Sequence, residues 1–195
     1  MKFPRATHLV VGFEHRAEAE RFKEELAERL KKFNLELQDE KTRLIEFGRY
    51  AAKDREARGE GKPETFNFLG FTHICGKKRK GQFCVLRQTM KKRVRAKLKS
   101  LDIEMKRRMH IPTPEQGQWL RSVLRGHYQY YGVPRNYPAM KTFRQQVARL
   151  WRRNLERRSQ RGRISQERMN RLMQEWLPRP HICQPYPEQR LCVTT

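Results

Sequence analysis

Apolar residues recur every three or four positions through most of the chain after residue 89. This spacing places side chains on one face of an α-helix, because a helix turns once every ~3.6 residues. The first such run consists of Met90, Val94, Leu98, Leu101, Met105 and Met109. Three more runs follow, after Thr113, Pro138 and Ser165. Apolar stripes of this kind must cover one another, so they predict a bundle of three to four helices over residues 88–178.

Local signals predict where these helices begin and end. Thr113, which precedes a proline, is the predicted N-cap of the second helix, and Gln116 is placed to close a capping box. Gly132 marks the predicted end of this helix, and Ser165 is the predicted N-cap of the last one. The proline-rich residues 179–195 predict an irregular tail.

The first part of the chain predicts a smaller mixed unit. Residues 8–13, 35–37 and 44–47 are short apolar segments typical of strands. The helical stripe between the first two consists of Ala19, Phe22, Leu26, Leu30 and Phe33. We therefore expect a small antiparallel sheet with one helix in residues 1–62, ending in a polar connector at Ala51–Glu64.

A β-hairpin is predicted over residues 63–87. Phe66–Ile74 and Phe83–Leu86 carry aromatic and β-branched residues typical of strands, and they flank a basic turn between Gly76 and Gly81. Strands followed by a run of helices indicate an α+β fold class.

Positive charge is concentrated in the second part of the chain. The sequence has 45 Lys and Arg against 21 Asp and Glu, a net charge of +24. Residues 1–62 hold 15 basic and 13 acidic residues, whereas residues 63–195 hold 30 and 8. So strong an excess indicates a polyanionic partner. Because no run of about 18 apolar residues marks a membrane span, the expected partner is nucleic acid.

Histidine and cysteine residues are candidate metal ligands. Two groups combine them: His73 with Cys75 and Cys84, and His181 with Cys183 and Cys192. Neither has the paired Cys-x-x-Cys spacing of zinc sites, so we expect free thiols and no bound metal. We also find no spacing of histidines and carboxylates typical of a hydrolytic site.

Basic side chains on the predicted helices and at the hairpin turn are the candidate RNA-binding residues, because cations that contact phosphates release counterions. They are Lys77, Lys78, Arg79, Lys80, Lys91, Lys92, Arg93, Arg95, Lys97, Lys99, Arg121, Arg125, Arg144, Arg149, Arg152, Arg153, Arg157 and Arg158. Tyr130 lies off the apolar stripe and is the candidate for stacking on an unpaired base. Tyr128 and Tyr131 share the stripe, so we expect them in the core.

Four sequence blocks point to a known family. They are Leu35–Leu37 with Glu40–Thr42, Phe66–Thr72, Arg125–Tyr128 with Tyr130 and Tyr131, and Trp176–Pro178. In this order they closely resemble group II intron reverse transcriptase–maturases. The resemblance implies that residues before about 50 are the end of the palm and that the hairpin grips the primer. It also implies that the helices are the thumb, or domain X, which binds intron RNA and helps it fold for splicing. The primer-grip-like residues are Phe68, Leu69, Gly70 and Phe71.

The sequence departs from this family at the catalytic metal site. The family holds magnesium with two adjacent aspartates, whose positions, counted back from Val10–Phe13, fall on Thr7 and His8. A hydroxyl and an imidazole are poor magnesium ligands. The fingers and the earlier palm have no counterpart here, and Lys41, which matches a lysine near the incoming nucleotide, is left as a turn residue. We therefore expect no catalytic residues, no cofactor and no polymerase activity from this chain alone.

The leading hypothesis is a C-terminal fragment of maturase type that binds group II intron RNA, or another structured RNA, and favours its splicing-competent fold. One alternative is a piece of an RNA-directed DNA polymerase that needs a separate N-terminal chain. Another is a degenerate remnant of a mobile element. We expect a cytoplasmic, bacterial-type protein associated with nucleic acid and not with membranes, and the sequence leaves its oligomeric state open.

Overall fold

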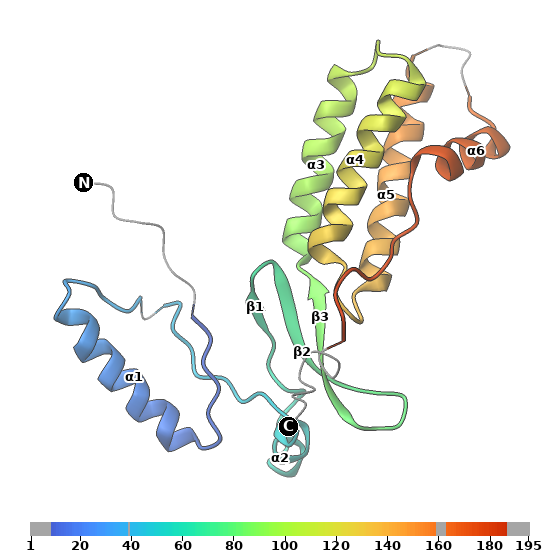
Figure 1. Ribbon diagram of the computed structural model, residues 1–195. Helices are drawn as coiled ribbons and strands as arrows, with labels where there is room; N and C mark the ends of the chain where they lie inside the picture. The colour runs from blue at the N-terminus through green and yellow to red at the C-terminus, as the bar shows by residue number, and fades with distance from the viewer. Residues whose placement is uncertain (1–8, 39, 159–162, 187–195) are drawn as a thin grey trace, which may run out of the picture. The chain divides into compact units, whose positions relative to one another are not determined.

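The computed structural model describes residues 9–38, 40–158 and 163–186. Within these ranges the chain is α+β, with six helices and one three-stranded antiparallel sheet (Figure 1). It divides into two compact units: Met1–Phe68 with Cys75–Cys84, and Leu69–Ile74 with Val85–Thr195. We call the first the N-terminal unit and the second the helical unit. The predicted α+β fold class is confirmed at this level.

The N-terminal unit contains the helix that its apolar stripe predicts, but this helix is poorly covered. Helix α1 (Arg16–Lys31) has no buried residue. Phe13 packs on Phe22, with 5.1 Å between the ring centroids. Leu26 and Leu30, on the same stripe, are half-buried. The described residues of the unit therefore cover the apolar face of α1 only in part.

The small antiparallel sheet predicted beside α1 is wrong for the residues that the structure describes. Leu9–Phe13, Leu35–Leu37 and Leu44–Phe47 form no strands. Short strands need neighbours that accept and donate their backbone hydrogen bonds, and these three segments do not pair with one another. Local apolar composition was therefore not enough to produce a sheet. Residue 8, the start of the first predicted strand, lies outside the described residues.

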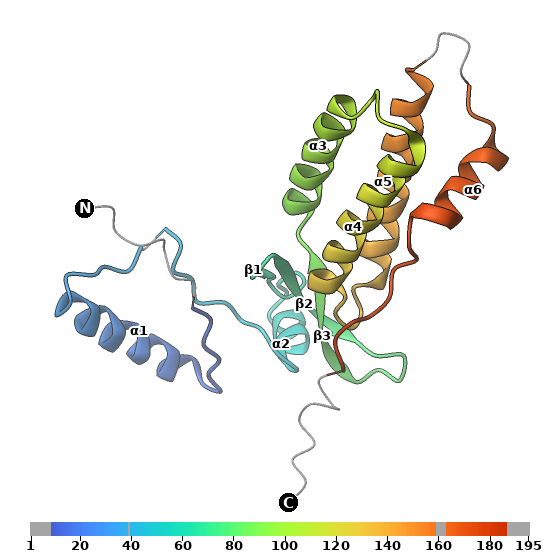
Figure 2. The same cartoon turned by 45° about the horizontal axis from the view of Figure 1, so that its top comes forward.

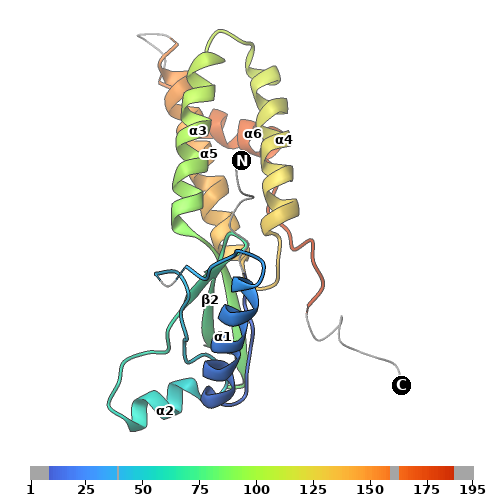
Figure 3. The same ribbon diagram turned by 90° about the vertical axis from the view of Figure 1, so that its left-hand side faces the viewer.

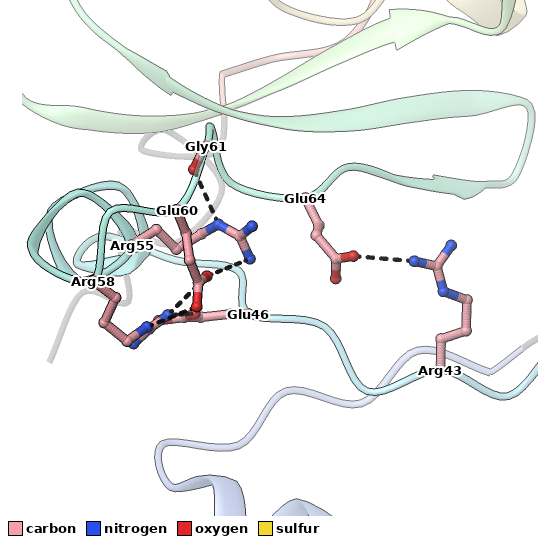
Figure 4. A network of polar contacts seen from close by, with 7 residues as sticks. All are labelled: Arg43, Glu46, Arg55, Arg58, Glu60, Gly61 and Glu64. Atoms are coloured by element: carbon pink, nitrogen blue, oxygen red, sulfur yellow. Dashed lines mark hydrogen bonds and ion pairs between the residues drawn. The ribbon is translucent and has the colours of Figure 1, made fainter.

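The polar connector predicted at Ala51–Glu64 contains a short helix, α2 (Ala51–Ala57). Arg58 at its end contacts the carboxylates of both Glu60 and Glu46 (Figure 4). Hydrogen bonds with these two carboxylates raise the pKa of Arg58 above its ordinary value. Ion pairs as exposed as these add little stability, but they give the connector a local structure that its composition did not predict.

The predicted hairpin is present and has one strand more than expected. Strands β1 (Phe66–Phe68), β2 (Phe71–Lys77) and β3 (Phe83–Thr89) pair in chain order. Leu69 and Gly70 both have positive φ, 46° and 80°, as the two central residues of a type I′ turn require. The segment predicted as the first arm of the hairpin is therefore two strands joined by this turn.

The predicted bundle of helices forms in the helical unit. Its members are α3 (Lys91–Arg107), α4 (Thr113–Tyr131), α5 (Tyr137–Glu156) and α6 (Gln166–Trp176). Helix α5 packs against both α3 and α4, and α6 packs against α4 (Figures 1 and 2). The apolar stripes form one core, whose largest fully buried side chains include Trp151, Tyr128, Phe143, Leu120, Leu124, Met140 and Val147. Tyr128 is thus in the core, as predicted.

The helix ends agree with the sequence at α6 but not at α4. Ser165 caps α6 and accepts a hydrogen bond from the backbone N–H of Arg168 at 3.2 Å. At α4 the N-cap is Pro112, and Thr113 is already helical, so the predicted threonine cap is wrong. Gly132 follows the last residue of α4, as predicted.

Gln116 does not close the predicted capping box, because its side chain is buried in the bundle. Its amide nitrogen donates to the carbonyl of Arg108, and its amide oxygen accepts from Nε1 of Trp151 at 3.0 Å. A glutamine here supplies the indole N–H of a fully buried tryptophan with the acceptor that it needs.

The chain after α6 packs on the bundle over the residues that are described. Leu177 is buried, and the hydroxyl of Tyr128 donates to the Pro178 carbonyl at 3.1 Å. In the predicted irregular tail, the N–H groups of Cys183 and Gln184 donate to the Gly132 carbonyl at 2.7 and 3.1 Å. Among the described residues, no helix is long and apolar enough to cross a membrane.

Candidate nucleic-acid interface

The outer surface of α3 carries the densest group of predicted RNA-binding residues. Helix α3 packs beside α5 (Figure 3). Val94, Leu98, Leu101 and Met105 pack in or against the core, which leaves the other positions of this helix at the surface. Six exposed cations occupy these positions: Lys91, Lys92, Arg93, Arg95, Lys97 and Lys99. Within the described ranges none of the six forms an ion pair or a hydrogen bond through its side chain.

The carboxylates of α3 are already paired with other cations. Asp102 pairs with Arg153 of α5 at 2.8 Å and with Lys106 at 2.9 Å. Burial opposes the ionisation of Asp102, but the hydrogen bonds from Lys106 and Arg153 outweigh it and contribute to a pKa of about 2. Glu104 pairs with Arg108 at 2.7 Å. These carboxylates therefore do not neutralise the six exposed cations.

Two predicted RNA-binding arginines hold α6 in place instead of facing solvent. Arg144 donates from Nε and Nη2 to the Leu177 carbonyl at 3.1 and 2.9 Å, and from Nη2 to the Met173 carbonyl at 3.0 Å. Carbonyls at the end of a helix lack intrahelical partners and lie at the negative end of its dipole. Arg121 donates to another carbonyl near the end of α6, and its guanidinium lies 5.1 Å from the ring centroid of Trp176.

Two further arginines are engaged where helices meet loops. Arg152 pairs with Glu156 at 3.0 Å and donates to the Ile164 carbonyl at 2.8 Å. Arg158 donates to the Ile111 carbonyl at 2.6 Å, and burial lowers its pKa. Together with Arg153, these side chains stabilise the bundle. The prediction from sequence therefore counted more basic side chains as available for RNA than the structure leaves without a partner.

Three predicted arginines stay exposed without a side-chain partner in the described part of the chain: Arg125 of α4, Arg149 of α5 and Arg157 just after α5. We call these three and the six exposed cations of α3 the free cations; all nine belong to the helical unit.

The predicted basic turn, Lys77–Lys80, belongs to the N-terminal unit. Its side chains are exposed except that of Lys78, which is half-buried.

Tyr130, the predicted stacking residue, is 54% exposed but has a structural contact. Its hydroxyl donates to the Leu69 carbonyl at 2.9 Å, and its ring lies nearly parallel to that of Phe71 with centroids 6.0 Å apart. The four primer-grip-like residues take different positions in the sheet. Phe68 ends β1, Leu69 and Gly70 form the turn, and Phe71 is buried.

A groove of about 360 Å³ between α3 and α4 was not predicted. Its lining consists of Lys97, Ser100, Leu101, Ile103, Glu104, Arg107, Trp119 and Val123. Trp119 is half-buried, and the guanidinium of Arg108 lies over its ring, 4.9 Å from the centroid. The sequence contained a signal for this residue, because Trp119, Val123 and Tyr130 follow one edge of the α4 stripe and not its centre.

The cysteine thiols are not part of this basic surface. Cys75, Cys84 and Cys183 are free, and burial raises the pKa of Cys75. In the part of the chain that the structure describes, no three His, Cys, Asp or Glu side chains gather as a metal site would require. Cys192 lies outside the described residues.

The positions that match the catalytic site of the resembled family give little structural information about catalysis. Thr7 and His8 lie outside the described residues, and Lys41 is exposed in a turn. Comparisons with protein-family models, with curated proteins and with solved structures found no match to this chain.

Proposed function

We propose that this chain binds structured RNA through the free cations of the helical unit and carries out no chemistry of its own. The observation that carries the proposal is the row of six exposed cations on α3, whose neighbouring carboxylates are paired with other residues. A surface with so little free negative charge to offset it attracts a polyanion.

The sequence resemblance supports group II intron RNA as the partner. Binding alone could assist such an RNA, because a ligand that prefers the folded state increases the population of that state. A preference of about 100-fold would shift the RNA folding equilibrium by about 2.7 kcal/mol. This action needs neither a bound metal nor a catalytic side chain.

The proposal is tested by filter binding of the chain to a folded group II intron RNA and to a structured control RNA over a salt series. Six phosphate contacts predict a log–log salt slope of about −4 to −5. Tighter binding to the intron at high salt would support a maturase-type role. Equal binding to both RNAs would reduce the proposal to a general RNA binder, and little binding at low salt would refute it.

A further inference from the structure

The groove between α3 and α4 places positive charge beside the half-buried ring of Trp119. On α4, Trp119, Val123, Gly126 and Tyr130 follow one another at steps of 4, 3 and 4 residues, which places them on one face. The distance from Trp119 to Tyr130 along the helix axis is about 16 Å at ~1.5 Å per residue. Two of these side chains, those of Trp119 and Val123, line the groove.

The facing side of α3 is polar and mainly basic. Arg93, Lys97, Ser100 and Arg107 share one face by the same spacing, and all are exposed. The one carboxylate on this face, Glu104, pairs with Arg108 at 2.7 Å and more weakly with Arg107 at 3.7 Å. The groove thus has Lys97 and Arg107 on the α3 wall, together with the apolar Leu101 and Ile103, and the ring of Trp119 on the α4 wall.

Gly126 leaves open space on the α4 face next to the groove. It is exposed, and a Cβ added to it would meet no atom within 4 Å. Glycine destabilises the interior of a helix, so its presence here has a cost that packing does not explain. A base or sugar could approach the helix backbone at this point.

We propose that this groove binds an unpaired, single-stranded segment of the bound RNA, with a base against Trp119 and phosphates near Lys97 and Arg107. The proposal rests on the proposed function and names the RNA feature that the site recognises. Sites for single strands combine a cationic groove that follows the backbone with aromatic side chains that stack on bases. The bases of an RNA duplex are already stacked on one another and cannot reach Trp119.

A protein helix fits this groove less well. Such a partner would need a continuous apolar row, but on the α3 wall Leu101 and Ile103 are interrupted by Lys97, Ser100, Glu104 and Arg107. The volume of about 360 Å³ lies at the lower end of the ~300–1,000 Å³ typical of sites for small ligands, so it suits a base better than a helix.

The test measures binding of the full chain to two probes, single-stranded oligo(A) RNA of about 12 nucleotides and a blunt RNA duplex of similar length. Gly126→Leu places a bulky side chain on the α4 face next to the groove without disturbing the core, and it should weaken oligo(A) binding roughly 5- to 100-fold, the range expected for the loss of one stacked base. Duplex binding should be nearly unchanged. Gly126→Ala is the matched control and should bind both probes like the original chain.

Trp119→Leu provides a second variant that keeps an apolar side chain and removes the stacking surface. Oligo(A) should quench the tryptophan fluorescence of the original chain, and this variant should lose both that quenching and a similar share of affinity. A Trp176→Phe control should keep the quenching. Thermal unfolding by circular dichroism verifies that each variant is folded.

The outcomes separate this proposal from the one on which it rests. Equal weakening for oligo(A) and duplex, or no weakening in either Gly126→Leu or Trp119→Leu, would overturn the groove and leave RNA binding in place. Failure of the original chain to bind either probe at low salt would overturn both. Selective loss of oligo(A) binding in the two variants would support the groove.

Discussion

Asn136 joins three segments of the helical unit through one fully buried amide. Its oxygen accepts from the Thr89 N–H at 3.0 Å, and its nitrogen donates to the Thr89 hydroxyl and to the Tyr131 carbonyl, both at 2.8 Å. Only an amide side chain offers an acceptor and two donors in one plane. The residue thus ties the end of β3 to the turn between α4 and α5.

Replacing this amide should be costly. Asn136→Ala removes the acceptor of the buried Thr89 N–H together with two further hydrogen bonds, and we expect the free energy of unfolding to fall by about 2–4 kcal/mol. Urea unfolding measures the change. Asn170→Ala, which removes an exposed hydrogen bond to Gln166 in α6, is the control and should cost less than about 0.5 kcal/mol. Similar costs for the two variants would contradict the assignment.

His127 makes stability depend on pH. Its ring stacks on Phe143 with centroids 3.8 Å apart, and burial, with a smaller effect of Lys97, lowers its pKa from 6.5 to about 4. As the pH falls, the unfolded chain takes up this proton first, so stability is lost between about pH 6.5 and pH 4. The pKa difference corresponds to about 3 kcal/mol.

His127→Phe should remove this component while keeping an aromatic ring against Phe143. Urea unfolding at about pH 7 and about pH 4 should show that the original chain loses about 3 kcal/mol more than the variant over this interval. Carboxylates such as Asp102 titrate in both proteins and cancel in the comparison. Parallel losses in the two proteins would show that His127 is not the group responsible.

At the scale of elements, two glycines on α4 should respond in opposite ways to the same change. A Cβ at Gly117 would collide with the ring of Trp176, where α6 crosses α4, whereas one at Gly126 meets open space. Gly126→Ala should therefore stabilise the chain by about 0.5–1 kcal/mol through helix propensity. Gly117→Ala should destabilise it by about 1–3 kcal/mol despite the same gain. Thermal unfolding compares them directly, and stabilisation by both would refute the close crossing of α6 on α4.

Two arginines of α5 should separate stability from RNA binding. Arg144 holds the end of α6 through three hydrogen bonds, and Arg149 is a free cation. Arg144→Gln should lower the free energy of unfolding by about 1.5–3 kcal/mol. Arg149→Gln should leave it within about 0.5 kcal/mol and instead reduce the salt dependence of RNA binding. Unfolding and filter binding on both variants check the division, and a reversal would mean that their roles are exchanged.

The bundle helices and the hairpin strands were predictable from the sequence, and the absence of strands at Leu9–Phe13, Leu35–Leu37 and Leu44–Phe47 was not. The stripe from Met90 to Met109 fixes which side of α3 is buried, because helical hydrogen bonds close within one segment. The segments Leu35–Leu37 and Leu44–Phe47 look like strands, but a strand exists only if another chain segment pairs with it. Leu69 and Gly70 show a related limit, since a turn with positive φ at a leucine is set by its surroundings.

The sequence predicted which helix carries most of the exposed positive charge, but it did not predict which basic residues are held in contacts within the bundle. Charge and helical spacing identified α3 correctly as a basic surface. They did not separate Arg144, which lies beside the buried face of α5, from Arg149, which lies outside it. A signal was present, because Arg144 precedes Val147 and Trp151 by three and seven residues, on the apolar stripe itself. The groove needed the relative placement of two helices, which no single stretch of sequence contains.

At the scale of the whole molecule, the position of charge should matter more than its total. Two triple variants each remove three positive charges. The first is Lys92→Gln, Arg95→Gln and Lys99→Gln on α3, and the second is Arg21→Gln, Arg29→Gln and Lys31→Gln on α1. The α3 variant should reduce the log–log salt slope of RNA binding by about 2–3, because cations on that surface contact phosphates. The α1 variant should change it little, and equal changes would mean that only net charge matters.

The arginine contacts to α6 have a consequence for which kinds of change the chain can tolerate. A lysine carries the same charge as an arginine but lacks the planar fork that reaches two carbonyls at once, as Arg144 does at Leu177 and Met173. A version of the bundle with every arginine changed to lysine would keep its attraction for polyanions and lose the attachment of its last helix. Substitutions that look neutral when only charge is counted would then remove the shape that presents the charge.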